Sequence, residues 1–229
     1  MLAHSLGWGR WLAVVLLLAS RLSAGEPAGR ELPPGTLLFL ENCNSVVETT
    51  TRGRIGHVAI VLPEAGVSWV YEATPAKVRR LTVAAYYDEL GRLNQRRDQD
   101  EAIRLWALAP LAPYEPRELE AMQAFLDEQL GRRYSVKNYV RGKSYDGIHC
   151  AELASRALNA SGRFAFEDCH RISPQALYTA VVPSHAAARR IDVPPPAAKE
   201  PWCQRAQRRT AEYFAWCGWS LQEAWLFLW

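Results

Sequence analysis

The chain has 229 residues, of which 49% are hydrophobic and 22% charged, and its formal net charge at pH 7 is +3. This length is sufficient for one domain with a full hydrophobic core and an appendage. The small net charge, and the absence of a domain pattern that combines aromatic with basic residues, argue against nucleic-acid binding.

The first 24 residues have the features of a secretory signal peptide. Arg10 supplies the positive charge at the start, residues 11–19 form a short apolar segment, and residues 23–25 are small, as at a cleavage site. The apolar segment is well short of the ~20 residues that a membrane-spanning helix needs. We therefore expect a secreted or periplasmic protein after cleavage, with an uncleaved anchor as the alternative.

The first half of the chain is rich in predicted strands. Runs of β-branched and apolar residues predict strands at 36–40, 56–62, 67–72 and 78–81, the last at a sheet edge, and alternation predicts one at 102–108. A hairpin loop is expected at 63–66. Residues 44–51 could form one or two helical turns, and 82–93 have a helical composition.

The second half is rich in predicted helices. The clearest covers residues 115–130, where a proline lies in the first turn and leucines mark one face. A second should run from about 149 to 158, and a third begins at Ser173 and Pro174. Strands followed by helices predict an α+β domain with segregated elements.

A proline-rich linker at residues 193–201 separates a domain over 25–192 from a tail over 202–229. The tail contains five of the nine tryptophans together with basic residues. Three interpretations remain open: a helical arm packed on the domain or on a second copy, attachment to a membrane surface, and a cover over the functional site.

The five cysteines fit an oxidising compartment. If Cys150 stays free, the other four could form two disulfide bridges in three possible connectivities; these four are Cys43, Cys169, Cys203 and Cys217. A zinc site is the competing interpretation, but the chain has no Cys-x-x-Cys pair and its histidines are scattered. We expect no metal and no cofactor.

Cys150 and His57 are candidates for a thiol–imidazole pair. Cys150 lies in the first turn of a predicted helix, where the helix dipole favours a thiolate, and an imidazolium nearby would favour it further. His57 begins a stiff apolar strand, and Gly56 before it should leave open space in front of the ring. The alternatives are a structural or bridged cysteine and a histidine satisfied within the core.

Glu72 ends the strand that follows His57, where an unpaired buried carboxylate would be costly. It could orient His57, as the third member of a catalytic triad does, or be an ordinary exposed glutamate. His149 adjoins the thiol, but neighbours on a helix project about 100° apart, so its ring should point away from the sulfur.

Five motifs occur in the order found in NlpC-type cysteine peptidases, and the order of histidine before cysteine is similar to the circularly permuted, YiiX/YebB-like branch. The motifs are Gly35-x-Leu-Leu-Phe39, Gly56-His57-Val-Ala-Ile-Val61, Val70-Tyr-Glu-Ala73, Leu130-Gly-x-x-Tyr134 and His149-Cys-Ala-Glu-Leu153. The resemblance covers about residues 34–181.

The resemblance implies a papain-like core in which an antiparallel sheet packs against helices and Cys150, His57 and Glu72 form the catalytic site. It also implies cleavage of amide bonds in cell-wall peptides or related small acyl substrates. The sequence departs from the family at His149 and Ala151 beside the thiol, and Asn42 or Asn44 would have to supply the oxyanion donor. Two rival functions are a lipid acyltransferase or lipase and an inactive module that binds cell-wall fragments.

Overall fold

The structure is a computed structural model, which describes residues 32–97, 99–142, 146–193, 201–207, 210–211 and 213–214. The predicted signal peptide, Cys217 and most of the linker and tail lie outside these residues.

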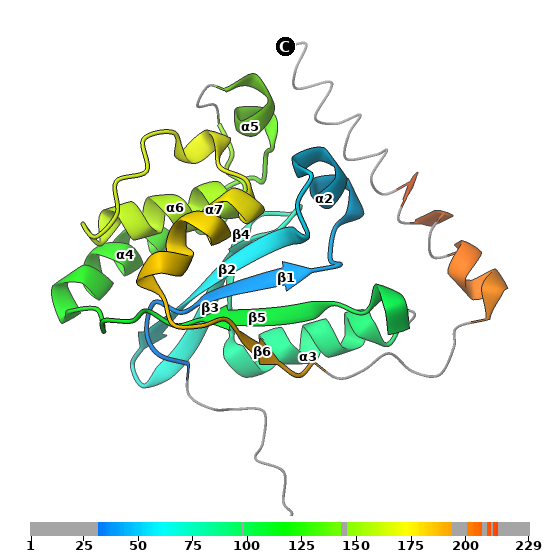
Figure 1. Cartoon of the computed structure of the whole chain (residues 1–229), viewed down its shortest axis with the longest axis horizontal. Helices are drawn as coiled ribbons and strands as arrows, with labels where there is room; N and C mark the ends of the chain where they lie inside the picture. The colour runs from blue at the N-terminus through cyan, green and yellow to red at the C-terminus, as the bar shows by residue number, and fades with distance from the viewer. Residues whose placement is uncertain are drawn as a thin grey trace, which may run out of the picture. The chain divides into compact units, whose positions relative to one another are not determined.

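One six-stranded sheet organises the domain, and every neighbouring pair of its strands is antiparallel. The spatial order is β4-β3-β2-β1-β5-β6 (Figure 1). The strands are β1 (Leu37–Glu41), β2 (Ile55–Glu64), β3 (Val67–Ala73), β4 (Val78–Thr82), β5 (Arg104–Leu108) and β6 (Arg189–Ile191). The predicted α+β class, the four early strands and the edge position of residues 78–82 are confirmed.

A hydrophobic cluster covers each face of the sheet. Successive side chains along a strand point to opposite faces, so neighbouring residues enter different clusters. Leu37 and Phe39 on β1 belong to one hydrophobic cluster, and Leu38 and Leu40 belong to the other. The central strands therefore read as continuous apolar runs rather than as a polar–apolar alternation.

Helices cover the two faces unequally. The first cluster includes residues of α4 (Pro116–Glu128), α6 (Cys150–Ala160) and α7 (Pro174–Val181), whereas the second includes residues of α3 (Val83–Asn94). Figure 1 shows the first three helices grouped on the same side of the sheet. Two short helices, α2 (Ser45–Thr51) and α5 (Lys137–Arg141), lie in the connections.

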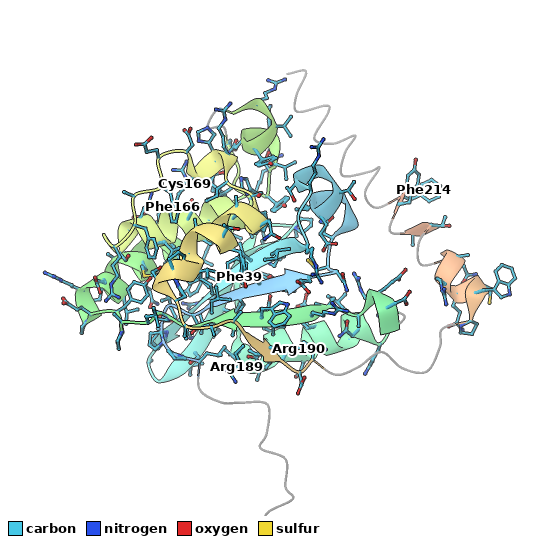
Figure 2. All side chains as sticks on the ribbon, in the orientation of Figure 1. Phe39, Phe166, Cys169, Arg189, Arg190 and Phe214 are labelled. Atoms are coloured by element: carbon cyan, nitrogen blue, oxygen red, sulfur yellow. The ribbon has the colours of Figure 1, made fainter. Side chains whose placement is uncertain are left out.

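Side chains cap the starts of two predicted helices, and the cap at Ser173 was expected from the sequence. Thr82 accepts a hydrogen bond from the Ala85 amide at the start of α3, and Ser173 accepts one from the Ala176 amide at the start of α7. Among the described α-helices and strands, α5 and β6 were not predicted. Helix α5 has only five residues, and β6 is held by backbone pairing of the exposed Arg189 and Arg190 with β5 (Figure 2). Neither segment is long enough to show the hydrophobic periodicity from which a helix or strand is predicted.

Three aromatic side chains are exposed in the described part of the tail, which is helical. Trp202 is 81% exposed, Tyr213 60% and Phe214 66%. Among the residues that the structure describes, no helix is both long and apolar enough to cross a membrane.

Candidate functional site

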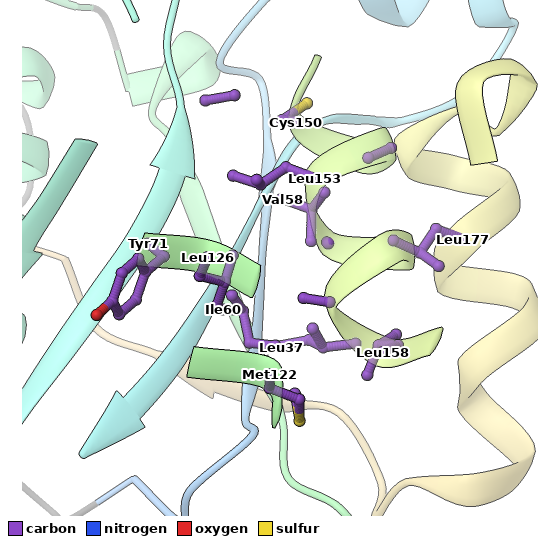
Figure 3. Packing of buried hydrophobic residues seen from close by; sticks show 14 of the residues in the cluster. Leu37, Val58, Ile60, Tyr71, Met122, Leu126, Cys150, Leu153, Leu158 and Leu177 are labelled. Carbon is purple, nitrogen blue, oxygen red and sulfur yellow. The ribbon is translucent and has the colours of Figure 1, made fainter. Parts of the chain in front are cut away.

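Cys150 is the first residue of α6 and its thiol is buried. Small residues of the helix pack in the hydrophobic cluster that also contains residues of β1 and β2; they include Ala151, Ala154 and Ala157. Figure 3 shows Cys150 at one end of this packed layer, with Leu153 and Leu158 following along the same helix. Apolar packing therefore fixes the position of α6, and α6 in turn fixes the position of the Cys150 sulfur.

His57 lies beside an irregularity in β2. Leu40 pairs with His57 and Glu41 pairs with Ile55, so Gly56 is an extra residue in the strand, as in a β-bulge. The expected open space at Gly56 is absent. A Cβ there would come within 2.8 Å of Glu48 Oε1 and 2.9 Å of Cys43 Sγ. The glycine serves close packing behind the histidine rather than access to it.

Glu72 contacts His57 directly. The ring Nε2 of His57 lies 2.8 Å from Oε2 of Glu72, whose side chain is only 5% exposed. The other carboxylate oxygen, Oε1, accepts a hydrogen bond of 2.8 Å from Nε of Arg79 on β4. The carboxylate is therefore buried with partners on both oxygens and is not an ordinary exposed glutamate.

The electrostatic environment favours a thiolate–imidazolium pair. Burial alone would raise the pKa of the Cys150 thiol, but the charge of His57 and polar contacts with His149 and His57 outweigh it, so this pKa is lowered. Burial alone would lower the pKa of His57, but Cys150 and Glu72 together raise it. The pKa of Glu72 is lowered despite burial, through His57 and Arg79.

His149 has a larger part in the site than its sequence position suggested. It is the N-cap of α6: its Nδ1 accepts a hydrogen bond of 3.3 Å from the Glu152 amide, and its Nε2 lies 3.2 Å from the carbonyl oxygen of His170. Its backbone is extended, with φ −102° and ψ 168°. The helical 100° rule therefore does not apply to His149, and this residue helps to lower the pKa of the Cys150 thiol.

The other described cysteines are free thiols, in contrast to the expected disulfide bridges. Cys43 Sγ lies 3.6 Å from the carbonyl oxygen of Leu40, and Cys169 Sγ lies 3.3 Å from that of Phe166. Figure 2 labels Cys169 and Phe166 in the segment that follows α6. The exposed Cys203 is also free. The thiols of Cys43 and Cys169 thus each have a local backbone partner rather than another sulfur.

Of the two expected oxyanion donors, Asn42 has its donor group engaged elsewhere. The side-chain amide of Asn42 donates to the carbonyl oxygen of Ala102, and Asn44 accepts a hydrogen bond from the Val47 amide. The first amides of a helix have no partner within the helix. Cys150 and Ala151 are the first two residues of α6, so their backbone N–H groups have no partner within the helix.

The described residues were also compared with the patterns of a metal site and of a ligand pocket. No three histidine, cysteine, aspartate or glutamate side chains among them cluster as metal ligands would. A pocket of about 420 Å³ lies between α6 and the segment that follows it, and its lining includes Phe125, Arg156, Phe166, Cys169 and His170.

Comparisons with known proteins gave limited similarity. No protein-family model and no curated protein matches the chain. One solved structure that resembles it is described as the metalloprotein YiiX from Escherichia coli O157:H7. The two are 13% identical, the similarity covers 72% of this chain and 99% of that one, and the TM-score is 0.49.

Proposed function

We propose that this protein is a cysteine hydrolase in which Cys150 is the nucleophile, His57 transfers the proton and Glu72 orients His57. The proposal depends above all on one observation, the 2.8 Å contact of His57 with Glu72 beside a thiol whose pKa His57 lowers. A thiolate attacks carbonyl groups, whereas a thiol does not, so this environment prepares Cys150 for reaction at neutral pH.

The reaction follows from the contacts of the two ring nitrogens. Nε2 of His57 is paired with Glu72, which leaves Nδ1 to share the proton of the thiol. The thiolate adds to the substrate carbonyl, and the imidazolium then gives its proton to the leaving amine, which departs and leaves a thioester on Cys150. Water, deprotonated by His57, attacks the thioester, releases the carboxylic acid and regenerates the thiolate–imidazolium pair.

The first turn of α6 is the proposed site for the negative charge that develops on the carbonyl oxygen. Backbone N–H groups at a helix start point outward and carry a partial positive charge. The amides of Cys150 and Ala151 meet this requirement, since they belong to the nucleophile and its neighbour. Donors fixed in a helix need no rearrangement during the reaction.

We further propose amide bonds in peptides, such as cell-wall peptides or related small acyl compounds, as the substrates. This rests on the resemblance of the five sequence motifs to NlpC-type peptidases. The signal-peptide features of the first 24 residues agree with a secreted or periplasmic site of action. The exposed aromatics of the tail favour lipid acyl groups as the second substrate class to be tested.

Mass spectrometry of an acyl adduct on Cys150 tests the proposal. The protein would be incubated with a panel of cell-wall-type peptides and, separately, with phospholipid vesicles, and then quenched in acid. We expect a peptide acyl adduct on Cys150 of the wild type and none in Cys150→Ala. The variant Cys169→Ala, which removes a buried thiol outside the site, should keep it.

An adduct formed only from phospholipid would replace the peptidase proposal by the acyltransferase one. A reactive Cys150 that forms no adduct with either substrate class, in a protein that still retains cell-wall peptide, would favour the inactive binding module.

A further inference from the structure

The candidate site continues beyond Glu72 into a chain of opposite charges across the sheet. Arg79 on β4 lies directly opposite Glu72 on β3 in the antiparallel register. Its Nε and Nη2 are 2.8 Å and 2.6 Å from Oε1 of Glu72, and the same Nη2 is 2.7 Å from Oε1 of Glu89 on α3. From α3 to α6, the order is therefore Glu89, Arg79, Glu72, His57 and Cys150.

The two oxygens of Glu72 have separate partners. Among the described residues, Oε1 accepts a hydrogen bond from Arg79, and Oε2 faces His57. A buried carboxylate is costly to leave without hydrogen-bond partners, and Glu72 is only 4% exposed, so each oxygen depends on its donor. The guanidinium is itself held from the far side by Glu89, which limits its freedom to turn away.

Two other titratable groups of this region, Tyr86 and Cys43, stay neutral near pH 7. Tyr86 on α3 has its pKa raised, by burial first and then by Glu72, and Cys43 has its pKa raised by burial and by Glu48. The charges of Cys150 and Glu72 raise the pKa of His57. Arg79 binds the other oxygen of Glu72, and Glu89 binds Arg79.

We propose that Arg79 is a positioning residue of the thiol site, which holds Oε1 of Glu72 so that Oε2 stays directed at His57. This rests on the proposed function, because it assigns Arg79 a part in preparing Cys150. Without the guanidinium, Oε1 becomes a buried acceptor with no donor, and Glu72 takes up a proton more readily. A neutral Glu72 no longer stabilises the imidazolium, and the thiol then holds its proton to higher pH.

Arg80 offers a matched control on the same strand. Its side chain pairs with Glu64 and Asp127 and lies over the ring of Trp69, so it has carboxylate partners but does not contact Glu72. Replacing Arg80 removes a guanidinium and its ion pairs at the neighbouring position and leaves the carboxylate of the site untouched.

The test is the pH profile of iodoacetamide alkylation at Cys150, followed by peptide mass spectrometry. In Arg79→Met the midpoint should rise by about 0.5 to 1 pH unit. Arg79→Lys, which keeps one donor, should give a smaller rise, and Arg80→Met none. In a Glu72→Gln background, Arg79→Met should cause no further shift, because the group through which it acts is gone.

An unchanged midpoint in Arg79→Met, an equal shift in Arg80→Met, or a full additional shift in the Glu72→Gln background would each overturn the assignment. Should Arg79→Met fail to fold, Arg79→Lys decides by the same comparison with Arg80→Lys. A wild-type midpoint equal to that of a free cysteine would instead overturn the proposed function, so the two failures are distinguishable.

Discussion

His57 and Glu72 meet through Nε2 and Oε2 at 2.8 Å, although fifteen positions separate them in the chain. The hairpin of β2 and β3 brings them together, because both residues lie on the sheet face that α3 covers. Cys150 reaches the same histidine from the opposite layer, at the start of α6. The imidazole thus lies between a carboxylate held by the sheet and a thiol held by a helix.

Cys150 should react much faster than Cys43, although the two thiols lie in the same part of the fold. His57 lowers the pKa of Cys150 against the effect of burial, whereas burial and Glu48 raise that of Cys43. At pH 7 we expect iodoacetamide to modify Cys150 at least about tenfold faster, as counted by peptide mass spectrometry. The difference should disappear in denaturant, and equal rates in the folded protein would refute it.

Glu72→Gln should destabilise the protein most near neutral pH. The pKa of Glu72 is lowered by folding, so its ion pairs add stability above the ordinary glutamate pKa, and this is lost as the pH falls through the folded value. We expect a loss of about 1–3 kcal/mol in the free energy of unfolding at pH 7 and a smaller loss at pH 4. Urea denaturation measures both.

Glu120→Gln, at an exposed position on α4, is the control for this substitution. It should change stability little at either pH. A Glu72→Gln loss as large at pH 4 as at pH 7 would show that the charge of Glu72 is not what stabilises the fold.

His149→Ala should weaken the start of α6, because the amide of Glu152 loses the acceptor that caps the helix. Removal of an N-cap side chain costs about 0.5–2 kcal/mol, and His149→Asn should recover most of it because asparagine also caps. Both variants should raise the pH at which Cys150 becomes reactive, since both lose the ring. Denaturation and alkylation separate the two effects, and an Asn variant with wild-type reactivity would exclude a role of the ring at the thiol.

Gly56→Ala should cost about 1–3 kcal/mol, as overpacking of a close contact does. The added Cβ meets Cys43 Sγ and Glu48 Oε1 at less than 3 Å. The loss should be smaller when Cys43 is already alanine, because one of the two contacts is then gone. A double-mutant cycle by thermal denaturation measures this coupling, and strictly additive losses would contradict the packing described at the bulge.

The strands and the main helices were predictable because their signals are local. The apolar run at residues 56–62, the cap at Ser173 and the leucine face predicted over residues 115–130 each act within one element. Short elements such as β6 depend on pairing with a strand that is distant in the sequence. Three residues are too few to show a pattern that predicts such pairing.

The sequence indicated which residues form the candidate site, but it did not indicate all of their contacts and orientations. Glu72 and His57 were paired from their places in a hairpin, but Arg79 was missed, although residues 72 and 79 lie symmetrically about the turn that joins β3 and β4. The orientation of His149 was wrong because the helix begins one residue later than predicted. The bulge at Gly56 depends on the register against β1, which the sequence of β2 alone does not contain.

The dependence of Cys150 on His57 can be measured as the alkylation midpoint of Cys150 in the wild type and in His57→Ala. We expect a wild-type midpoint below that of a free cysteine, near 8.5, and a return toward that value when the imidazole is removed, to about 8 or above. The same midpoint in both proteins would show that His57 does not lower the pKa of the thiol and would rule out its proposed role.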